Sequence, residues 1–378
     1  MNKITIANKK INRRSFIGTL AYLGSNALAG CHKKTESQGP FSGRELKIFV
    51  YAGAHEQTMR DVFAPRFEKI TGAKIILHAG WWEGLAKLKT APVKNPPFDL
   101  MICDATQGYP AIREGLFAQL NLENIPNHKN LYQPTIDNWV FKGRHGLTYP
   151  DSVMTLAYNK ELVQETPLKW EDLIKTNLKN KIGLYSSFYL SLYTFACIKA
   201  GTENRHGTAH ELINNNLDEV LRFARNYRDH VKLWWPTSND MILALANKDI
   251  TAGNMHSPEY IKALKEKETL GASVPLKDRA FVQVFWTIPA ESKNKELAEL
   301  AINELFSNDV QLEFSRRGSA TSILSVAETM AEEDLFWKSL YPHTKDQFES
   351  LEYYPYDTYS RNWKEISETW DRTILRKG

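Results

Sequence analysis

The sequence predicts an open α/β fold in which parallel strands are joined by helical crossovers. Short apolar strand patterns at 46–50, 74–78 and 98–102 are separated by helical patterns at 59–70 and 83–90. This alternation predicts parallel crossover units, because two parallel strands need a long connection, usually a helix, between them. Similar alternation resumes after residue 180, so the sequence predicts two such regions.

The individual elements follow from periodicity and from signals at their ends. Residues 46–50 alternate and then run apolar, as a half-buried strand does. The next segment repeats apolar residues at steps of three and four, the spacing of one helix face, at Met59, Val62, Phe63, Phe67 and Ile70. Gly72 follows at the position where a helix commonly ends in a left-handed glycine.

The later part of the chain carries the second region. Strands are expected at 181–185 and 250–252, and helices at 190–196, 217–227 and 240–246. With 42% apolar residues in 378 positions, the chain has enough core-forming side chains for two domains. The aromatic-rich stretch 335–376 is expected to pack as a cap on a domain, because so many aromatic rings are rarely left in water.

Residues 1–30 have the pattern of an export signal. Basic residues without any acid precede a mostly apolar or small run at 16–30, which ends at Cys31. As a helix this run would reach about 22 Å, short of the ~30 Å hydrocarbon core of a membrane. A cytosolic protein with a basic tail would leave the cysteine at the end of the apolar run unexplained.

Two motifs refine the export prediction. Residues 12–17 resemble the twin-arginine signal, and residues 28–31 resemble the lipobox of bacterial lipoproteins, in which the cysteine receives lipid. We therefore expect a signal peptide at 1–30, lipidation of Cys31 and a flexible polar tether at 31–43. The mature protein would lie in the periplasm or cell envelope, attached to a membrane through its lipid.

Charge and cysteine usage narrow the function classes. The signal contains 5 of the 48 basic residues and none of the 44 acidic ones, so the mature chain keeps 43 against 44 and nothing favours nucleic-acid binding. Cys103 and Cys197 are expected as inert core residues, although a disulfide between them stays possible. No Cys-x-x-Cys, His-Glu-x-x-His or Gly-x-Ser-x-Gly spacing predicts a metal site or a catalytic centre.

A series of collinear segments resembles the periplasmic solute-binding proteins of ABC importers, of the polyamine and ferric-iron type. One of them carries the Phe-Glu-Lys-x-Thr-Gly pattern at 67–72. In chain order the matching segments are 46–75, 85–104, 146–159, 168–184, 245–254, 286–311 and 315–322. Together they extend over about three quarters of the chain, from residue 46 to about residue 327.

The resemblance implies the periplasmic binding protein-like (type II) fold, two open α/β lobes joined by a hinge. Lobe 1 would comprise 44–150 plus about 254–305, and lobe 2 would comprise 151–253 plus about 306–378 with the aromatic cap. It also implies a monomer that captures a small polar organic solute between the lobes and delivers it to an ABC permease in the inner membrane. Neither a cofactor nor a catalytic reaction is expected.

The resemblance and the geometry of parallel sheets point to the same loops, because such sheets bind ligands beyond the carboxyl ends of their strands. The expected ligand-binding residues lie in or next to these loops: Tyr51, Gly53, His55, Glu56, Trp81, Trp82, Asp104, Ser186, Ser187, Trp235, Met255, His256 and Trp286. Aromatic faces among them favour an organic ammonium. Structural roles stay open as well, since Glu56 suits a helix dipole, Asp104 and the two serines suit helix caps, and His256 suits the core.

The chain departs from polyamine binders of this type at three places, one of which is near Met255, where those proteins favour an aromatic residue. Ser186 and Ser187 stand where those proteins tend to carry acids, and Arg279 lies near a segment where they favour another acid. Because fewer carboxylates compensate a buried polycation poorly, a singly charged, zwitterionic or neutral solute stays open beside a polyamine-like one. Three further functions also stay open: a ferric-iron binding protein, a hydrolase or transferase on an α/β scaffold, and a surface protein whose aromatic tail binds a partner.

Overall fold

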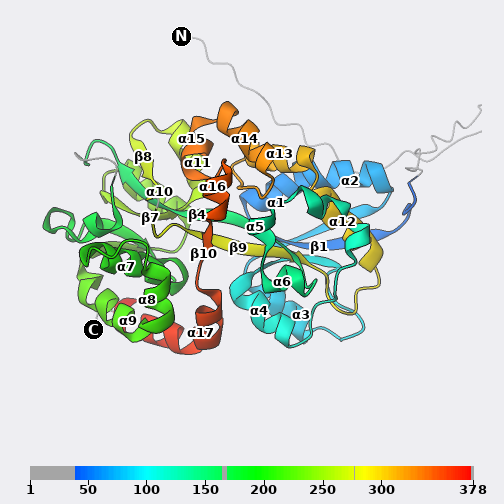
Figure 1. The fold of residues 1–378 in the computed structure, drawn as a ribbon, viewed down its shortest axis with the longest axis horizontal. Coiled ribbons are helices and arrows are strands. Elements are labelled where there is room, and N and C mark those ends of the chain that lie inside the picture. Colours follow the sequence, from blue (N-terminus) through cyan, green and yellow to red (C-terminus); the bar gives the residue numbers. More distant parts are fainter. Residues whose placement is uncertain (1–38, 164–167, 276, 376–378) are drawn as a thin grey trace, which may run out of the picture. The chain divides into compact units, whose positions relative to one another are not determined.

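The computed structural model describes residues 39–163, 168–275 and 277–375, and their strands form one ten-stranded sheet in the order β2-β1-β3-β9-β4-β7-β5-β6 (Figure 1). Off this path, β10 pairs with β9 and β8 pairs with β4. The strands are β1 Glu45–Tyr51, β2 Lys74–Gly80, β3 Leu100–Asp104, β4 Leu147–Asn159, β5 Ile182–Tyr185, β6 Val231–Trp235, β7 Ala252–His256, β8 Leu270–Ser273, β9 Ala280–Thr287 and β10 Glu352–Tyr353.

Two groups of parallel strands lie at the two ends of this sheet. The first strand group is β1, β2 and β3, with Ile48 of β1 opposite both Leu77 and Leu100. The second strand group is β5, β6 and β7, with Ile182 of β5 opposite both Val231 and Ala252. The two parallel regions expected from the sequence are therefore confirmed.

Two antiparallel strands join the groups. β9 pairs with β3 of the first group and with β4, while β4 also pairs with β7 of the second group. The β4–β9 register shifts between Pro150 and Val153, where proline cannot donate to the ladder. Residues 37–378 cluster as one unit, and the lobe boundaries expected from the sequence stay a prediction.

Helices cover both faces of each strand group. In Figure 1, α1 and α2 lie on one side of the first group and α3 and α4 on the other. The helices up to β4 are α1 Ala54–Thr58, α2 Ala64–Thr71, α3 Glu83–Thr90, α4 Ala105–Arg113, α5 Gln133–Ile136 and α6 Trp139–Lys142, with the π-helix η1 Met59–Phe63 between α1 and α2. Those after it are α7 Phe188–Thr202, α8 Ala209–Asn215, α9 Leu217–Tyr227, α10 Ser238–Ala246, α11 Ser257–Glu266, α12 Lys295–Leu305, α13 Asn308–Arg316 and α14 Leu324–Glu333.

Most of the expected elements form where the sequence predicts them. Gly72 ends α2 in the left-handed conformation, with φ of 75°, as expected for a glycine cap. Two strands begin two residues later than expected, at Leu100 and Ala252. The later start of β3 has a visible cause. The side-chain carboxylate of Asp99, the residue before β3, accepts from the backbone N–H of Lys47 in β1. A side-chain contact therefore takes the place of strand pairing at this residue.

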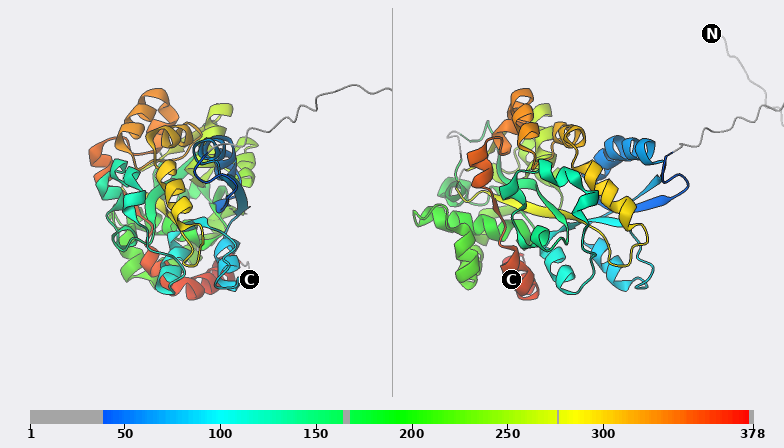
Figure 2. Two further views of the ribbon diagram at one scale, coloured as in Figure 1. Left: turned by 90° about the vertical axis from the view of Figure 1, so that its right-hand side faces the viewer. Right: turned by 45° about the vertical axis from the view of Figure 1, so that its right-hand side comes forward.

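The C-terminal segment packs against the rest of the described chain. It forms α15 Leu335–Leu340, α16 Lys345–Glu349, β10, α17 Tyr356–Trp370 and the π-helix η7 Asp371–Leu375. Its buried aromatic side chains are Trp337, Tyr341, Phe348, Tyr354, Tyr356, Tyr359 and Trp370. α17 contacts both α4 and α7, and Figure 2 shows it running along one edge of the molecule.

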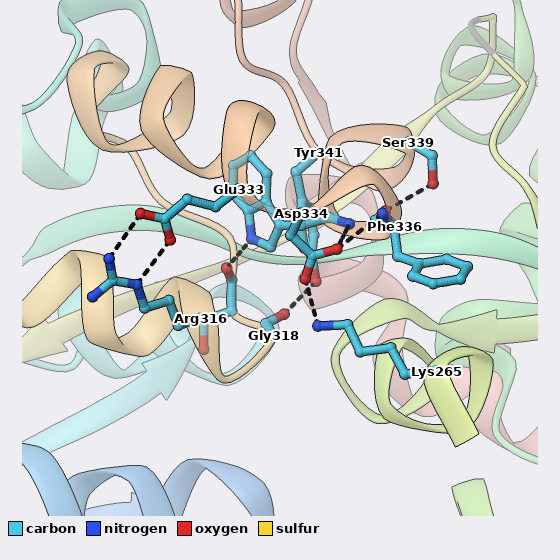
Figure 3. Close-up of polar contacts among 10 residues, drawn as sticks. Lys265, Arg316, Gly318, Glu333, Asp334, Phe336, Ser339 and Tyr341 are labelled. Carbon is cyan, nitrogen blue, oxygen red and sulfur yellow. Dashed lines mark hydrogen bonds and ion pairs between the residues drawn. The ribbon is translucent and has the colours of Figure 1, made fainter.

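Polar contacts fix the start of this cap to α13 (Figure 3). Arg316 donates twice to the Glu333 carboxylate, at 2.9 and 2.8 Å. Asp334 caps α15 by accepting from two backbone N–H groups and also contacts Lys265 of α11. The Tyr341 hydroxyl donates to the carbonyl of Gly318 at 2.8 Å. The chain that follows is thus anchored on α11 and α13.

The predicted twin-arginine motif, lipobox and Cys31 lie outside the described residues, as does most of the tether. Its described end is packed, because Phe41 is buried and its N–H donates to the carbonyl of Thr71. Cys103 and Cys197 are both buried free thiols, which confirms them as core residues and excludes the disulfide. In the part of the chain that the structure describes, no helix is both long and apolar enough to cross a membrane.

Candidate functional site

The carboxyl ends of the first strand group present aromatic side chains. Tyr51 ends β1, and its ring stacks on Trp81 with centroids 5.6 Å apart and planes 14° apart. Trp81 is 53% exposed, and Trp82 is 39% exposed beside Tyr189, at 5.9 Å between ring centroids. Trp82 also packs on Trp363, with ring centroids 5.6 Å apart, so both tryptophans contact neighbouring rings while part of their surface stays exposed.

Three carboxyl groups are linked electrostatically through Asp151. Asp104 ends β3, Asp151 lies at the irregular point of β4, and Glu259 lies in the first turn of α11. Burial raises the pKa of Asp151 to about 7, with smaller contributions from the charges of Glu259 and Asp104. Burial also raises the pKa of Glu259, and that of Asp104 to about 6 against the effect of its hydrogen bonds.

The second feature of these acids is that they have no basic partner in the part of the chain that the structure describes. Within residues 39–163, 168–275 and 277–375, no basic side chain pairs with any of the three. Oε2 of Glu259 is buried without a hydrogen-bond partner in the same ranges. Leaving a buried carboxylate unpaired is unfavourable, and a positively charged group placed among these side chains would relieve it.

Two histidines at the ends of opposite strand groups are neutral. Burial lowers the pKa of both His55 and His256 to about 4. The ring of His55 lies 5.8 Å from Trp286, and both of its nitrogens are buried without a partner among the described residues. Nδ1 of His256 lies 3.4 Å from the hydroxyl of Ser152. A neutral imidazole can donate to or accept from a bound molecule without adding charge.

Asp104 links the two strand groups directly. Its Oδ1 accepts from the N–H of Thr106 at 2.7 Å, so it caps α4, the structural role that the sequence left open. Its Oδ2 accepts from the hydroxyl of Tyr189 on α7 at 2.7 Å. Both oxygens are thus used by the protein itself.

The other predicted residues serve mainly structural contacts in this arrangement. Glu56 pairs with Arg60 at 2.6 Å, and Ser187 caps α7. The carbonyl of Ser186 accepts from Nε1 of Trp370 at 2.8 Å. Gly53, with φ of 91°, lies just before α1. The remaining three are core residues, with exposed fractions of 2% or less: Trp235, Met255 and Trp286. The ligand-binding roles of all these residues stay predictions.

Sequence reasoning missed Asp151 and Glu259. Asp151 stands directly after a proline inside the strand segment 146–159, and that break in the strand was the available signal. Glu259 follows Ser257 and Pro258, a helix-start pattern placed directly after a strand. Their proximity could not be foreseen, because it depends on how α11 packs against β4.

Neither a group of metal ligands among the described residues nor either of two described surface pockets lies in this region. Among the described residues, no group of three or more His, Cys, Asp or Glu side chains is arranged to hold a metal ion. Two surface pockets, of about 220 and 390 Å³, lie elsewhere, beside Lys47 and along α17. The hydrogen bond between Tyr189 and Asp104 joins α7 of the second strand group to the end of β3 in the first.

Comparison with known proteins decides the family. The model of the family described as bacterial extracellular solute-binding protein matches residues 63–341. The chain belongs to this family. The sequence-based prediction of a solute-binding protein is thereby confirmed, and an extracellular family supports the predicted location in the periplasm or cell envelope.

Relatives and solved structures agree with this assignment. A periplasmic protein of Salmonella typhimurium named for 2-aminoethylphosphonate binding is 26% identical over 175 residues. That alignment covers 44% of this solute-binding protein and 44% of the relative, so it spans less than half of either chain.

Two crystal structures have the same fold. An ABC transporter substrate-binding protein from Bradyrhizobium japonicum has a TM-score of 0.74 at 13% identity, covering 88% of this chain and 99% of that one. The spermidine/putrescine substrate-binding protein PotD from Streptococcus pneumoniae has a TM-score of 0.67 at 18% identity, covering 86% and 99%. The predicted periplasmic binding protein-like fold is confirmed.

Proposed function

We propose that this protein is the solute-capturing subunit of an ABC importer and that it holds a small solute bearing an ammonium group between the two strand groups. The strand groups then correspond to the two lobes, and β4 and β9 form part of the hinge. The observation that carries the proposal is the set of three acids, Asp104, Asp151 and Glu259, which have no basic partner among the described residues.

The surroundings of the acids suit an ammonium group. Tyr51 experiences the charges of Asp104 and Asp151, so its ring lies near both carboxyls. The stacked pair Tyr51 and Trp81 offers aromatic faces, which attract organic cations. His55 supplies two ring nitrogens, without a partner among the described residues, for a second polar group of the solute. A zwitterion or a short amine could use all of these contacts.

The names of the relatives support the same chemistry. 2-Aminoethylphosphonate, spermidine and putrescine all carry at least one ammonium group at neutral pH, although they differ in size and in their other charges. The shared feature matches the acids of this chain. A ferric-iron site is not favoured, since the described residues contain no suitable group of ligands.

Ligand screening by thermal unfolding tests the proposal. We expect 2-aminoethylphosphonate, 4-aminobutyrate, putrescine or betaine to raise the melting temperature, and a neutral sugar to leave it unchanged. A solute at 100 times its Kd adds about 2.7 kcal/mol to the free energy of unfolding. Stabilisation by the neutral sugar alone would refute the ammonium assignment.

Variants then locate the site. Asp151→Asn and Glu259→Gln should each weaken the binding of the identified amine about thirtyfold, which corresponds to ~2 kcal/mol. Glu266→Gln is the matched control, because Glu266 lies on the same helix as Glu259 but is exposed and pairs with Lys262. If all three variants bind the amine with the same affinity, the binding site does not include Asp151 and Glu259.

The same proposal places the protein at a membrane. Lipid on Cys31 would keep the domain near a permease, and the exported, lipid-anchored form follows from the motifs at 12–17 and 28–31. The mature chain would act as a monomer that exchanges between open and closed forms, as cleft-binding proteins with two lobes do.

A further inference from the structure

The C-terminal segment 351–375 contacts both strand groups at once. On the side of the first group, Asp357 of α17 pairs with Arg113 of α4 at 3.0 Å. On the side of the second group, the ring of Trp363 lies 4.7 Å from Phe188 of α7. Because α4 follows β3 and α7 follows β5, a single helix bridges elements of the two groups (Figures 1 and 2).

A chain of hydroxyl hydrogen bonds runs through the first residue of α17. The backbone N–H of Gln283 donates to the hydroxyl of Tyr356 at 2.8 Å, and this hydroxyl lies 2.7 Å from that of Tyr189. The Tyr189 hydroxyl donates to Asp104 at 2.7 Å, so its only proton is committed and the Tyr356 hydroxyl must be the donor to Tyr189. The order of donors is therefore fixed from β9 to the carboxylate.

The position of Gln283 explains why a side chain reaches it. On this edge of β9, β10 pairs as far as Phe281 and β3 pairs from Val284 onward. Gln283 falls in the gap between these two strands, and the Tyr356 hydroxyl satisfies the N–H that no strand reaches. The segment is thus tied to the hinge strand as well as to both groups.

We propose that residues 351–375 form a closing strap in which Tyr356 and Tyr189 are positioning residues that hold Asp104 of the first strand group against α7 of the second. The strap stabilises the closed arrangement seen here before any solute arrives, and this role rests on the proposed function, for which closure matters. All three side chains are buried, with exposed fractions of 3% for Tyr356, 4% for Tyr189 and 8% for Asp104. Hydrogen bonds to a carboxylate in such a place are stronger than bonds between neutral groups.

The chain offers matched controls for this strap. Tyr354 and Tyr359 belong to the same aromatic cluster, with ring centroids 5.3 and 6.2 Å from that of Tyr189. Their hydroxyls are buried but have no hydrogen-bond partner among the described residues. Replacing any one of the four tyrosines by phenylalanine removes one hydroxyl oxygen from the same aromatic cluster. Only the replacements of Tyr189 and Tyr356 interrupt the hydrogen-bond chain to Asp104.

Distance measurements on the solute-free protein test the strap. Spin labels at Lys94→Cys and Asp218→Cys, both exposed and on opposite strand groups, report opening in a chain that also carries Cys31→Ser to prevent lipidation. We expect Tyr356→Phe and Tyr189→Phe to shift the ratio of open to closed forms about tenfold toward the longer distance. Tyr354→Phe and Tyr359→Phe should leave the distance distribution unchanged.

The same set of variants distinguishes opening of the two strand groups from unfolding of the protein. Melting temperatures of all variants identify any replacement that unfolds the protein, and restoring Tyr356 or Tyr189 must restore the short distance. Identical distributions for all four variants, or equal opening by the control variants, would overturn the strap. No solute is required, so a failed ligand screen would refute the proposed function and leave this result unaffected.

Discussion

Burial and, to a smaller extent, the charge of Glu259 on α11 raise the pKa of Asp151 on β4, although the two residues are far apart in the sequence. Neither has a basic partner in the described part of the chain. A buried acid whose ionisation is further opposed by a second acid makes the protein sensitive to pH and to cations at this position. Both its stability and its affinity for a cation should therefore depend on pH.

Asp151→Asn should become more stable relative to the natural protein as the pH rises from about 4 to about 7. The pKa of Asp151 is raised from 3.8 to about 7, so between these values the native state still holds a proton that the unfolded state has released. The natural protein therefore loses stability progressively as the pH rises from about 4, and this loss is complete near pH 7. His55 and His256 oppose this trend, because their lowered pKa values favour the native state at higher pH. The difference between variant and natural protein isolates Asp151.

We expect the difference in unfolding free energy to change by about 3 kcal/mol over this range. Urea unfolding at pH 4, 5, 6 and 7 measures it. Asp218→Asn serves as the control at an exposed position, and its difference should stay constant. A constant difference for Asp151→Asn as well would contradict the raised pKa.

An ammonium solute should bind more tightly as the pH rises from 5 to 8. The solute requires ionised carboxylates, whereas Asp104 and Asp151, with pKa values of about 6 and about 7, hold protons at the lower pH. Affinity should therefore rise about tenfold per pH unit while one proton must leave. Calorimetry in buffers of different ionisation enthalpy measures the protons released, and no proton release at pH 6 would be inconsistent with this site.

The fold was predictable because local patterns agree with the tertiary structure. The spacing from Met59 to Ile70 and the glycine at 72 correspond to η1, α2 and its left-handed cap. The continuous helix expected there is interrupted by a π-helical turn, which apolar spacing alone does not reveal.

The candidate site was only partly predictable. Loops after the strands of parallel sheets could be named in advance, and Tyr51, Trp81, Asp104 and His256 lie in or next to them. The link from Asp104 through Tyr189 to Tyr356 could not be foreseen, since it joins three distant segments through side-chain packing. The acids at 151 and 259 were missed for the same reason.

Cys31→Ser should release the exported protein from the membrane fraction into the soluble one. Lipid attached at the lipobox cysteine would be the only strong membrane anchor that the sequence predicts, because the run at 16–30 is too short to span. Fractionation of cells followed by detection of the protein measures the change. Cys103→Ser is the control for loss of a thiol, and it should leave membrane association intact because Cys103 is a buried residue. Retention of the Cys31→Ser protein on membranes would argue against the anchor.

Trp337→Ala should destabilise the protein strongly, whereas Leu335→Ala should not. Both residues lie on α15, but Trp337 is fully buried and Leu335 is 77% exposed. In the natural protein, Nε1 of Trp337 donates to the carbonyl of Ser319 at 2.8 Å. Removing the indole opens a cavity and takes this donor away, so we expect the free energy of unfolding to fall by about 3–5 kcal/mol. Truncating the exposed leucine should change stability by less than about 0.5 kcal/mol.

Denaturant unfolding of both variants distinguishes a cap that is part of the core from an aromatic arm kept free for a partner. Equal and small effects would favour the arm, because a side chain that contributes nothing to the core can be removed without cost to the fold.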